Sequence, residues 1–338
     1  MPLFPRPAAI RNTAGAQFGW VHRRDMLALL AVPVVAAAAK PASVTGQRCR
    51  VTAWMSGDAG EALLDAAAIQ ASVQGQSAKV VAVRGPDSPL LLMVVLDLTG
   101  DMALIGPARD SLKQAVGELK PHDWVALMRA QDGLRVLADP EPARDALLAQ
   151  LDTFETTGRA ALLEAVQPAA ALAERVLHRS PIRIAVLFLT DSNIYNYRED
   201  YTNPVVNPSD SRDLSRRFPE ALVREKTARL AATLNAFDAP VFIQHLAWLR
   251  DPLNAAYQSG LQQVAEATGG SAAFSRAQAD VPVDVAQMVQ KIANHWAIDL
   301  ELPAATPRTF SVLLAVAGRE IQYRTKFTLA PHGKETKS

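Results

Sequence analysis

The chain has 338 residues, with 35 Lys and Arg against 34 Asp and Glu, 49% hydrophobic residues and a single cysteine, Cys49. This composition excludes a disordered chain, a collagen and a coiled coil, because it supplies enough apolar residues for a buried core. The net charge of +1 argues against nucleic acid or an anionic membrane as a partner. One cysteine excludes a disulfide framework and a cysteine-rich metal site.

Residues 1–39 have the pattern of an export signal peptide. Arg23 and Arg24 precede an apolar run over residues 26–39, which ends in alanines. The run is shorter than the roughly 20 residues of a membrane-spanning helix, and its small residues suit signal-peptidase cleavage. The paired arginines resemble a twin-arginine signal, and an ordinary secretory signal is the alternative. Both routes predict a periplasmic or secreted protein without a stable membrane span.

The middle of the chain alternates strand and helix patterns. The apolar run LLLMVVL at residues 90–96 predicts a parallel strand buried on both faces, and apolar spacing predicts a helix over 102–119. The pattern then predicts further elements in chain order: strand 124–129, its hairpin partner 134–138, helix 142–151, helix 160–178, strand 182–190, helix 215–236, strand 240–246, helix 253–267 and strand 272–274. This alternation predicts an α/β fold, a doubly wound and mostly parallel sheet with helices on both faces.

The two flanks of this region have strand patterns without helices. Segments 49–54, 69–73 and 79–83 precede it, and segments 297–302, 309–316 and 320–329 follow it. We expect the flanks to pair into one small β-sandwich, because the ends of a domain commonly lie close together. The predicted organisation is a signal peptide (1–39), a flanking β-sandwich (40–88 and 297–330) and an α/β domain (89–296).

Four stretches resemble a von Willebrand factor type A domain, and more narrowly the exported bacterial proteins with a VWFA-related domain. They are LLLMVVLDLTGDM (90–102), GRAALLEAV (158–166), VLFLTD (186–191) and VAEATGGSAAF (264–274). The resemblance implies the fold predicted above. It also implies a site for Mg²⁺ at the carboxyl ends of the strands, the metal-ion-dependent adhesion site, where Mg²⁺ takes oxygen ligands.

The resemblance assigns the positions of this site residue by residue. Asp97 takes the first position, Thr99 the second, Asp101 the third and Asp191 the last. The threonine position aligns with Ala160, which has no ligand atom. Two interpretations therefore stay open, a working metal site and a vestigial one without a cofactor. Asp97 and Thr99 as caps of the following helix are a further alternative.

A long loop after the second buried strand is the other candidate site. It contains Asn193, Tyr195, Tyr197 and Tyr201, and tyrosine and asparagine are typical of binding loops. We expect these four residues to contact a partner protein, and an insertion without a partner is the alternative. By contrast, His245 lies inside an apolar strand and is predicted to be a buried histidine with its hydrogen bonds satisfied.

No nucleophile–base motif, phosphate-binding loop or metal-binding histidine pattern is present in the sequence. The favoured function is therefore an exported, non-catalytic module that binds another protein through the carboxyl edge of the sheet. An inert envelope scaffold is the alternative, and it predicts that loop substitutions leave binding unchanged. A metal-assisted hydrolase using Asp97, Asp101 and Asp191 is the third candidate, and it predicts a closed pocket with a metal-bound water.

Overall fold

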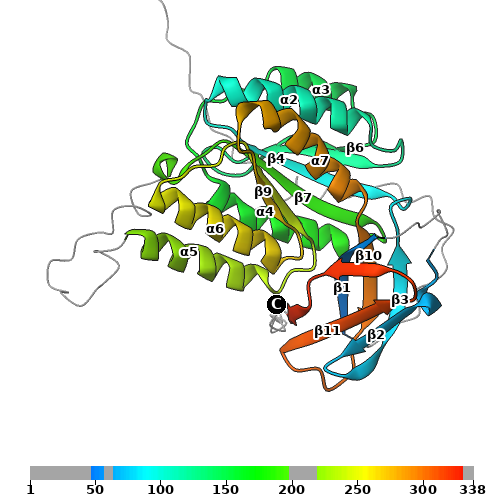
Figure 1. Ribbon diagram of the computed structural model, residues 1–338. Helices are drawn as coiled ribbons and strands as arrows, with labels where there is room; N and C mark the ends of the chain where they lie inside the picture. The colour runs from blue at the N-terminus through cyan, green and yellow to red at the C-terminus, as the bar shows by residue number, and fades with distance from the viewer. Residues whose placement is uncertain (1–46, 57–63, 198–218, 330–338) are drawn as a thin grey trace, which may run out of the picture. The chain divides into compact units, whose positions relative to one another are not determined.

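A computed structural model describes residues 47–56, 64–197 and 219–329. Its centre is a six-stranded sheet with the strand order β6-β5-β4-β7-β8-β9 (Figure 1). All neighbouring strands are parallel except β5 and β6, which form an antiparallel hairpin. The strands are β4 (Leu90–Asp97), β5 (Trp124–Arg129), β6 (Arg135–Glu141), β7 (Arg183–Thr190), β8 (Val241–His245) and β9 (Ala272–Phe274). The predicted α/β sheet is therefore confirmed.

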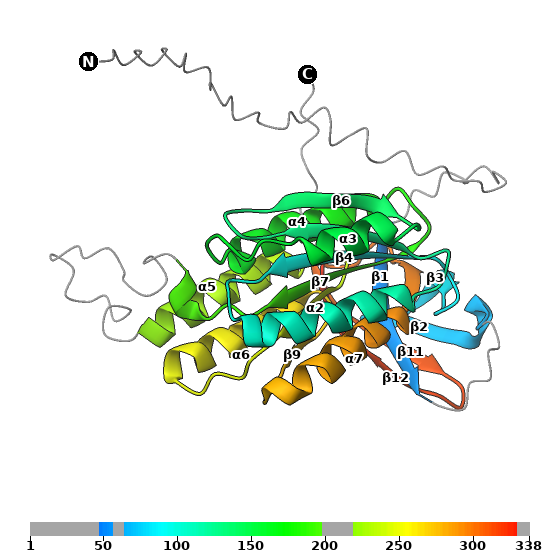
Figure 2. The ribbon, with the colours of Figure 1, turned by 90° about the horizontal axis from the view of Figure 1, so that it is seen from above.

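Helices cover both faces of this sheet, as Figures 1 and 2 show from two directions. One layer contains α2 (Met102–Gly117), α3 (Asp145–Asp152) and α7 (Val281–Ala293). The other contains α4 (Leu162–Leu177), α5 (Pro219–Leu234) and α6 (Pro252–Ala267). All eight residues of β4 are buried, as the LLLMVVL run predicts. The sequence analysis missed α7, although its buried face recurs at helical spacing: Val281, Val285, Met288, Val289 and Ile292.

The two flanks of the α/β region pair into an antiparallel sheet with the order β12-β1-β10-β3-β2-β11-β13. Strand β1 pairs with β10, and β2 pairs with β11, so both ends of the described chain meet here. The strands are β1 (Arg48–Ser56), β2 (Ile69–Val73), β3 (Gln76–Arg84), β10 (Trp296–Glu301), β11 (Thr309–Val316), β12 (Glu320–Tyr323) and β13 (Lys326–Thr328). The predicted β-sandwich is not confirmed as such, because hydrogen bonds link all seven strands in one order.

This seven-stranded sheet has a hydrophobic core of its own. Val51, Ile298 and Val312 are fully buried in it, and the rings of Phe310 and Phe327 stack with their centroids 5.7 Å apart. The segment 320–329, predicted as one strand, is two strands with Arg324 and Thr325 between them.

The predicted boundaries of the signal peptide and of the two domains stay predictions.

Arginines join the seven-stranded sheet to the α/β sheet at the amino ends of the parallel strands. The Arg50 guanidinium pairs with Asp299 at 2.6 Å and donates to the carbonyl of Ile182, which directly precedes β7. The Arg324 guanidinium donates to the carbonyl of Phe237 before β8 (3.2 Å) and to that of Ala267, where α6 ends. The seven-stranded sheet thus packs at the amino edge of the α/β sheet, and the opposite, carboxyl edge is left uncovered by it.

Arg183 holds the start of β7 in place from inside the protein. Its side chain is fully buried and donates to the carbonyls of Ser88 (3.0 and 2.8 Å), Pro86 (2.8 Å), Ala293 (2.6 Å) and His295 (3.0 Å). Burial lowers the pKa of this guanidinium to about 10. The contacts connect the segment before β4 with the end of α7, where backbone carbonyls have no helical partner.

Within the described ranges, no helix is long and apolar enough to cross a bilayer.

Candidate functional site

The carboxyl ends of the parallel strands bring the predicted site residues together. In the register of the sheet, Asp97 at the end of β4 lies opposite Thr190 of β7, which lies opposite His245 of β8. The loops that follow these three strands are therefore neighbours. Ligands of open α/β sheets bind at this edge, so the edge is the candidate site.

Asp97 is fully buried and accepts hydrogen bonds from three groups of the protein. Its Oδ1 accepts from the backbone N–H of Ala161 at 3.0 Å. Its Oδ2 accepts from the hydroxyls of Thr190 at 3.1 Å and Ser192 at 2.8 Å. Burial raises the pKa of the carboxyl to about 6, although the three hydrogen bonds favour the charged form. Asp97 thus connects β4, α4 and the loop after β7.

A chain of hydroxyl groups continues from Ser192 into the core. The Ser192 hydroxyl lies 3.4 Å from that of Tyr257, which is 2.8 Å from the hydroxyl of Tyr197. All three side chains are buried, and burial is the main cause that raises the pKa of both phenols. This network is a structural link between the loop after β7 and α6.

Asp191 occupies a cradle of backbone N–H groups at the start of α2. Its Oδ1 accepts from the N–H of Thr99 at 2.6 Å and from the Thr99 hydroxyl at 3.1 Å. Its Oδ2 accepts from the N–H groups of Gly100 (3.1 Å) and Asp101 (3.0 Å). Gly100 has a φ of 132°, which glycine adopts readily and which turns successive N–H groups toward one anion. The protein's own carboxylate therefore fills an anion-binding cradle.

Asp101 caps a helix, whereas the resemblance assigns it the third position of the metal site. Its side chain accepts from the N–H of Ala103 at 3.1 Å and caps α2. The expectation that Asp97 and Thr99 cap this helix is therefore corrected, because Asp97 bonds to α4 and to the segment Thr190–Ser192, and Thr99 bonds to Asp191.

The arrangement does not fit Mg²⁺. Asp191 accepts four hydrogen bonds, which use all of its lone-pair sites, so Mg²⁺ would have to displace donors there. Asp97 accepts three and is fully buried, which leaves one lone-pair site without a path for the ion's bound waters. The position expected to hold a threonine is Ala160, whose buried methyl side chain offers no oxygen. Among the described residues, no group of three or more His, Cys, Asp or Glu side chains could hold a metal ion.

His245 is fully buried with both ring nitrogens bonded, as the sequence predicts. The N–H of Ala247 donates to Nδ1 at 3.1 Å, so the proton lies on Nε2, which donates to the Ser192 carbonyl at 2.8 Å. Burial lowers the pKa of the imidazole to about 4, and it is neutral at neutral pH. His245 positions the loop after β7 and is not a base for catalysis.

The Tyr-rich loop is divided between surface and core. The Tyr195 side chain is 61% exposed, and its hydroxyl donates to Asp251 at 3.1 Å. Tyr197 is buried against Tyr257, which differs from the expectation that it faces a partner. The Asn193 side chain accepts from the N–H of Tyr195 and shapes the turn. Tyr201 lies outside the described residues.

Two features of this edge were missed by the sequence analysis. Trp248, on the loop after β8, is 47% exposed and packs edge-to-face on Phe274, with ring centroids 5.4 Å apart. Its place directly after a buried strand was the available signal. A hollow of about 380 Å³ lies over the site and is lined by Thr99, Asp132, Gly158, Arg159, Ala160 and Asn196.

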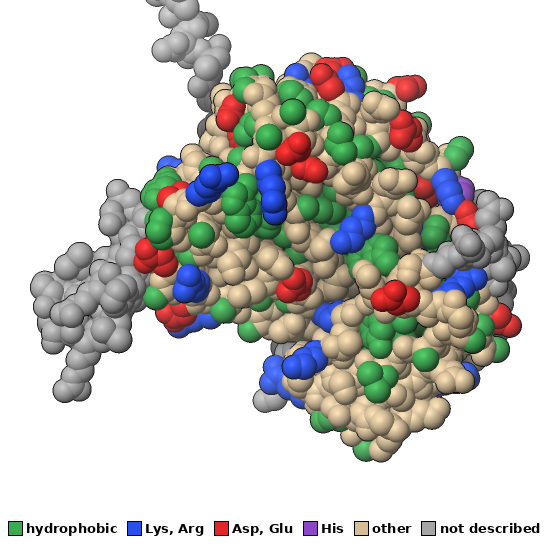
Figure 3. Space-filling model, in the orientation of Figure 1, with side chains coloured by type: hydrophobic (Ala, Val, Ile, Leu, Met, Phe, Trp, Pro, Cys, Tyr) green, Lys and Arg blue, Asp and Glu red, His purple; other side chains and the backbone are tan. Residues whose placement is uncertain are grey.

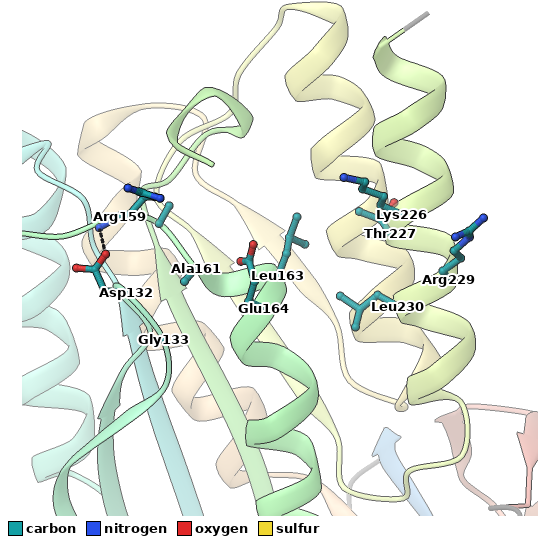
Figure 4. Close-up of a pocket in the computed structure, with 11 residues that line it drawn as sticks. Asp132, Gly133, Arg159, Ala161, Leu163, Glu164, Lys226, Thr227, Arg229 and Leu230 are labelled. Carbon is teal, nitrogen blue, oxygen red and sulfur yellow. Dashed lines mark hydrogen bonds between the residues drawn. The ribbon is translucent and has the colours of Figure 1, made fainter. Parts of the chain in front are cut away.

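A larger cavity of about 720 Å³ adjoins this hollow between α4 and α5 (Figure 4). Glu164 and Leu163 from α4 face Thr227 and Leu230 from α5 across it. At its rim the N–H of Arg159 donates to Asp132 at 3.3 Å, which joins two loops of the edge.

Comparison with known proteins concerns the fold. No protein-family model matches the chain, and no curated protein matches it in sequence. Among solved structures, it is similar to a von Willebrand factor type A protein from Catenulispora acidiphila, with 13% identity, 85% of this chain and 74% of that chain covered, and a TM-score of 0.42. It is also similar to the vWF domain of the type V pili tip protein Mfa5 from Porphyromonas gingivalis (12% identity, 61% and 95% covered, TM-score 0.39).

A third similar structure is proximal thread matrix protein 1 from the mussel byssus with a zinc-occupied MIDAS motif, the metal-ion-dependent adhesion site (10% identity, 64% and 48% covered, TM-score 0.42). Further von Willebrand factor type A structures match at similarly low identity, among them the ArnB paralog VWA2 from Sulfolobus acidocaldarius (9% identity, 85% and 77% covered, TM-score 0.40). TM-scores below 0.5 carry no conclusion about activity or partners, which depend on the site itself.

Proposed function

We propose that this protein is an exported, non-catalytic module that binds another protein through the carboxyl edge of its α/β sheet, with a degenerate metal-ion-dependent adhesion site. The observation that supports it best is the self-contained bonding of Asp97 and Asp191. Because their oxygens accept from the protein's own donors, the proposal gives these two carboxylates a structural role in place of metal binding or catalysis. It offers a rigid surface.

The placement of the two sheets supports the same proposal. The seven-stranded sheet packs at the amino edge through Arg50 and Arg324, whereas the carboxyl edge has exposed large side chains: Met102, Tyr195 and Trp248. Exposed aromatic residues on loops held by a rigid scaffold are typical of protein-binding surfaces. Export to the periplasm or outside the cell follows in this proposal from the signal pattern around Arg23 and Arg24, which lies outside the described residues.

The test is site-specific photo-crosslinking in cells that express the protein natively. A photoreactive amino acid replaces Tyr195 or Trp248 at the carboxyl edge, and Leu313, which is 60% exposed on the seven-stranded sheet, is the control. We expect a discrete adduct of the same mass from both edge positions, unchanged by a chelator, and none from Leu313. An adduct from Leu313 alone would instead support the envelope scaffold.

A further inference from the structure

Side-chain contacts link the loops after β7, β8 and β9, and we call the three aromatic residues of these contacts, Tyr195, Trp248 and Phe274, the aromatic ridge. The hydroxyl of Tyr195 donates to Asp251 and so joins the loop after β7 to the loop after β8. The Trp248 ring packs on Phe274, which joins the loop after β8 to the end of β9. Three separate segments thus support one another, and the ridge is preorganised for binding.

Two arginines flank this ridge. Arg250 follows Trp248 by two residues, and Arg276 follows Phe274 by two residues. Both side chains are exposed, and neither has a hydrogen-bond or ion-pair partner among the described residues. Figure 3 shows basic side chains beside hydrophobic ones near the start of α6, which the loop after β8 leads into.

Three carboxylates in the described part of the same loops are already bonded within the protein. Asp191 accepts from the N–H groups of residues 99–101. Asp251 accepts from the backbone and side chain of Asn254 and from Tyr195. Asp280 accepts from the N–H of Ala277 at 3.0 Å. Beside the aromatic ridge, the charged side chains of residues 247–251 and 275–280 that are left to bond a partner are therefore the guanidinium groups of Arg250 and Arg276.

We propose that the aromatic ridge, with Arg250 and Arg276, binds a carboxylate-rich segment of a partner protein without a metal ion. A guanidinium offers paired N–H donors that match a carboxylate, and an aromatic surface beside it takes the apolar part of the same segment. Arginine here supplies the positive charge that a metal supplies in a working adhesion site. The inference rests on the proposed function and specifies the chemistry of its partner.

The experiment measures fluorescence anisotropy of a short, acetylated and amidated peptide that alternates Glu and Leu, in the presence of a chelator. Matched peptides replace every Glu by Gln, and a labelled oligothymidylate tests nucleic acid. We expect the Glu peptide to bind and the Gln peptide to bind at least tenfold more weakly. Arg250→Glu and Arg276→Glu should each weaken binding of the Glu peptide by about tenfold, the value of one charged hydrogen-bonded pair.

Arg308→Glu is the matched control. Arg308 is exposed next to β11 of the seven-stranded sheet, and its side chain also has no partner in the described part of the chain. We expect this variant to bind the Glu peptide like the parent protein. Equal loss in all three variants would indicate nonspecific attraction and overturn the proposal, and so would binding of oligothymidylate with the same arginine dependence.

Crosslinking from Met102, which is 56% exposed at the same edge and lies outside the aromatic ridge, separates this inference from the proposed function. If the adduct still forms when Arg250 and Arg276 are both replaced by Glu, the protein binds a partner at this edge, but not through its carboxylates. If no adduct forms in the parent protein, the proposed function itself fails. Loss of the adduct in the double variant, with an unchanged midpoint of thermal unfolding, supports both.

Discussion

Replacement of Asp97 by Asn should change how stability depends on pH. The folded protein raises the pKa of Asp97 from 3.8 to about 6 because the carboxyl is fully buried. A folded state that holds a proton more tightly than the unfolded state is stabilised at low pH, and this contribution is lost as the pH rises through about 6. A shift of about 2 pKa units corresponds to about 3 kcal/mol in the free energy of unfolding.

Urea unfolding at a series of pH values from about 4 to about 7 measures this contribution. Asn is expected to fit, because its amide oxygen accepts from Ala161 and its NH₂ group donates to the hydroxyl oxygens of Thr190 and Ser192. We expect the parent protein to lose about 3 kcal/mol relative to Asp97→Asn across this range. Taking the difference cancels the other titrating groups, including His245, whose lowered pKa gives the opposite slope.

Asp139→Asn on the exposed edge strand β6 is the matched control, since it removes an acidic group without changing a buried one. This variant keeps Asp97, so the pH dependence assigned to Asp97 should remain in it. If the curves of Asp97→Asn and the parent protein run parallel from about pH 4 to about pH 7, burial does not govern the ionisation of Asp97, and the reasoning is refuted.

Three further predictions concern stability. Arg183→Met should lower the free energy of unfolding by about 3–5 kcal/mol in urea, because the carbonyl groups of Ser88, Ala293 and His295 lose the donor that Arg183 supplies, and a loss below about 1 kcal/mol would contradict this. Gly260→Ala should cost about 1–3 kcal/mol, because a Cβ there would lie 2.6 Å from the Thr227 Cβ between α5 and α6. Thr227→Gly in the same chain should recover part of that loss, and strictly additive effects would show that the helices do not clash. The midpoint of thermal unfolding should be the same in excess Mg²⁺ as in a chelator. A midpoint higher by several degrees in Mg²⁺ would show that the protein binds the metal.

Hydrophobic patterning predicts the α/β fold well because its central strands are buried on both faces. The run at residues 90–96 has no polar residue, so no other element of that length suits it. The division of segment 320–329 into β12 and β13 was not predictable, since it depends on Arg324 reaching carbonyls at the ends of two helices far away in the sequence.

The candidate site was only partly predictable for a related reason. Sequence placed Asp97 and Asp191 at one edge correctly, because both directly follow the residues of a buried strand. It did not indicate which donors their oxygens accept from, since the decisive groups are backbone N–H groups of Ala161 and of residues 99–101, which every residue type except proline carries. The burial of Tyr197 likewise follows from the position of Tyr257 on α6, which no local pattern encodes.

The labelling rate of Cys49, the single cysteine, reports how often the seven-stranded sheet opens. Its thiol is 5% exposed in β1, and burial raises its pKa, so a thiol reagent reacts only after the seven-stranded sheet opens. When opening and closing are fast, the labelling rate is the intrinsic rate multiplied by the open fraction. A ligand bound at the carboxyl edge can then be detected from the far side of the molecule, by whether it slows the labelling of one sulfur atom.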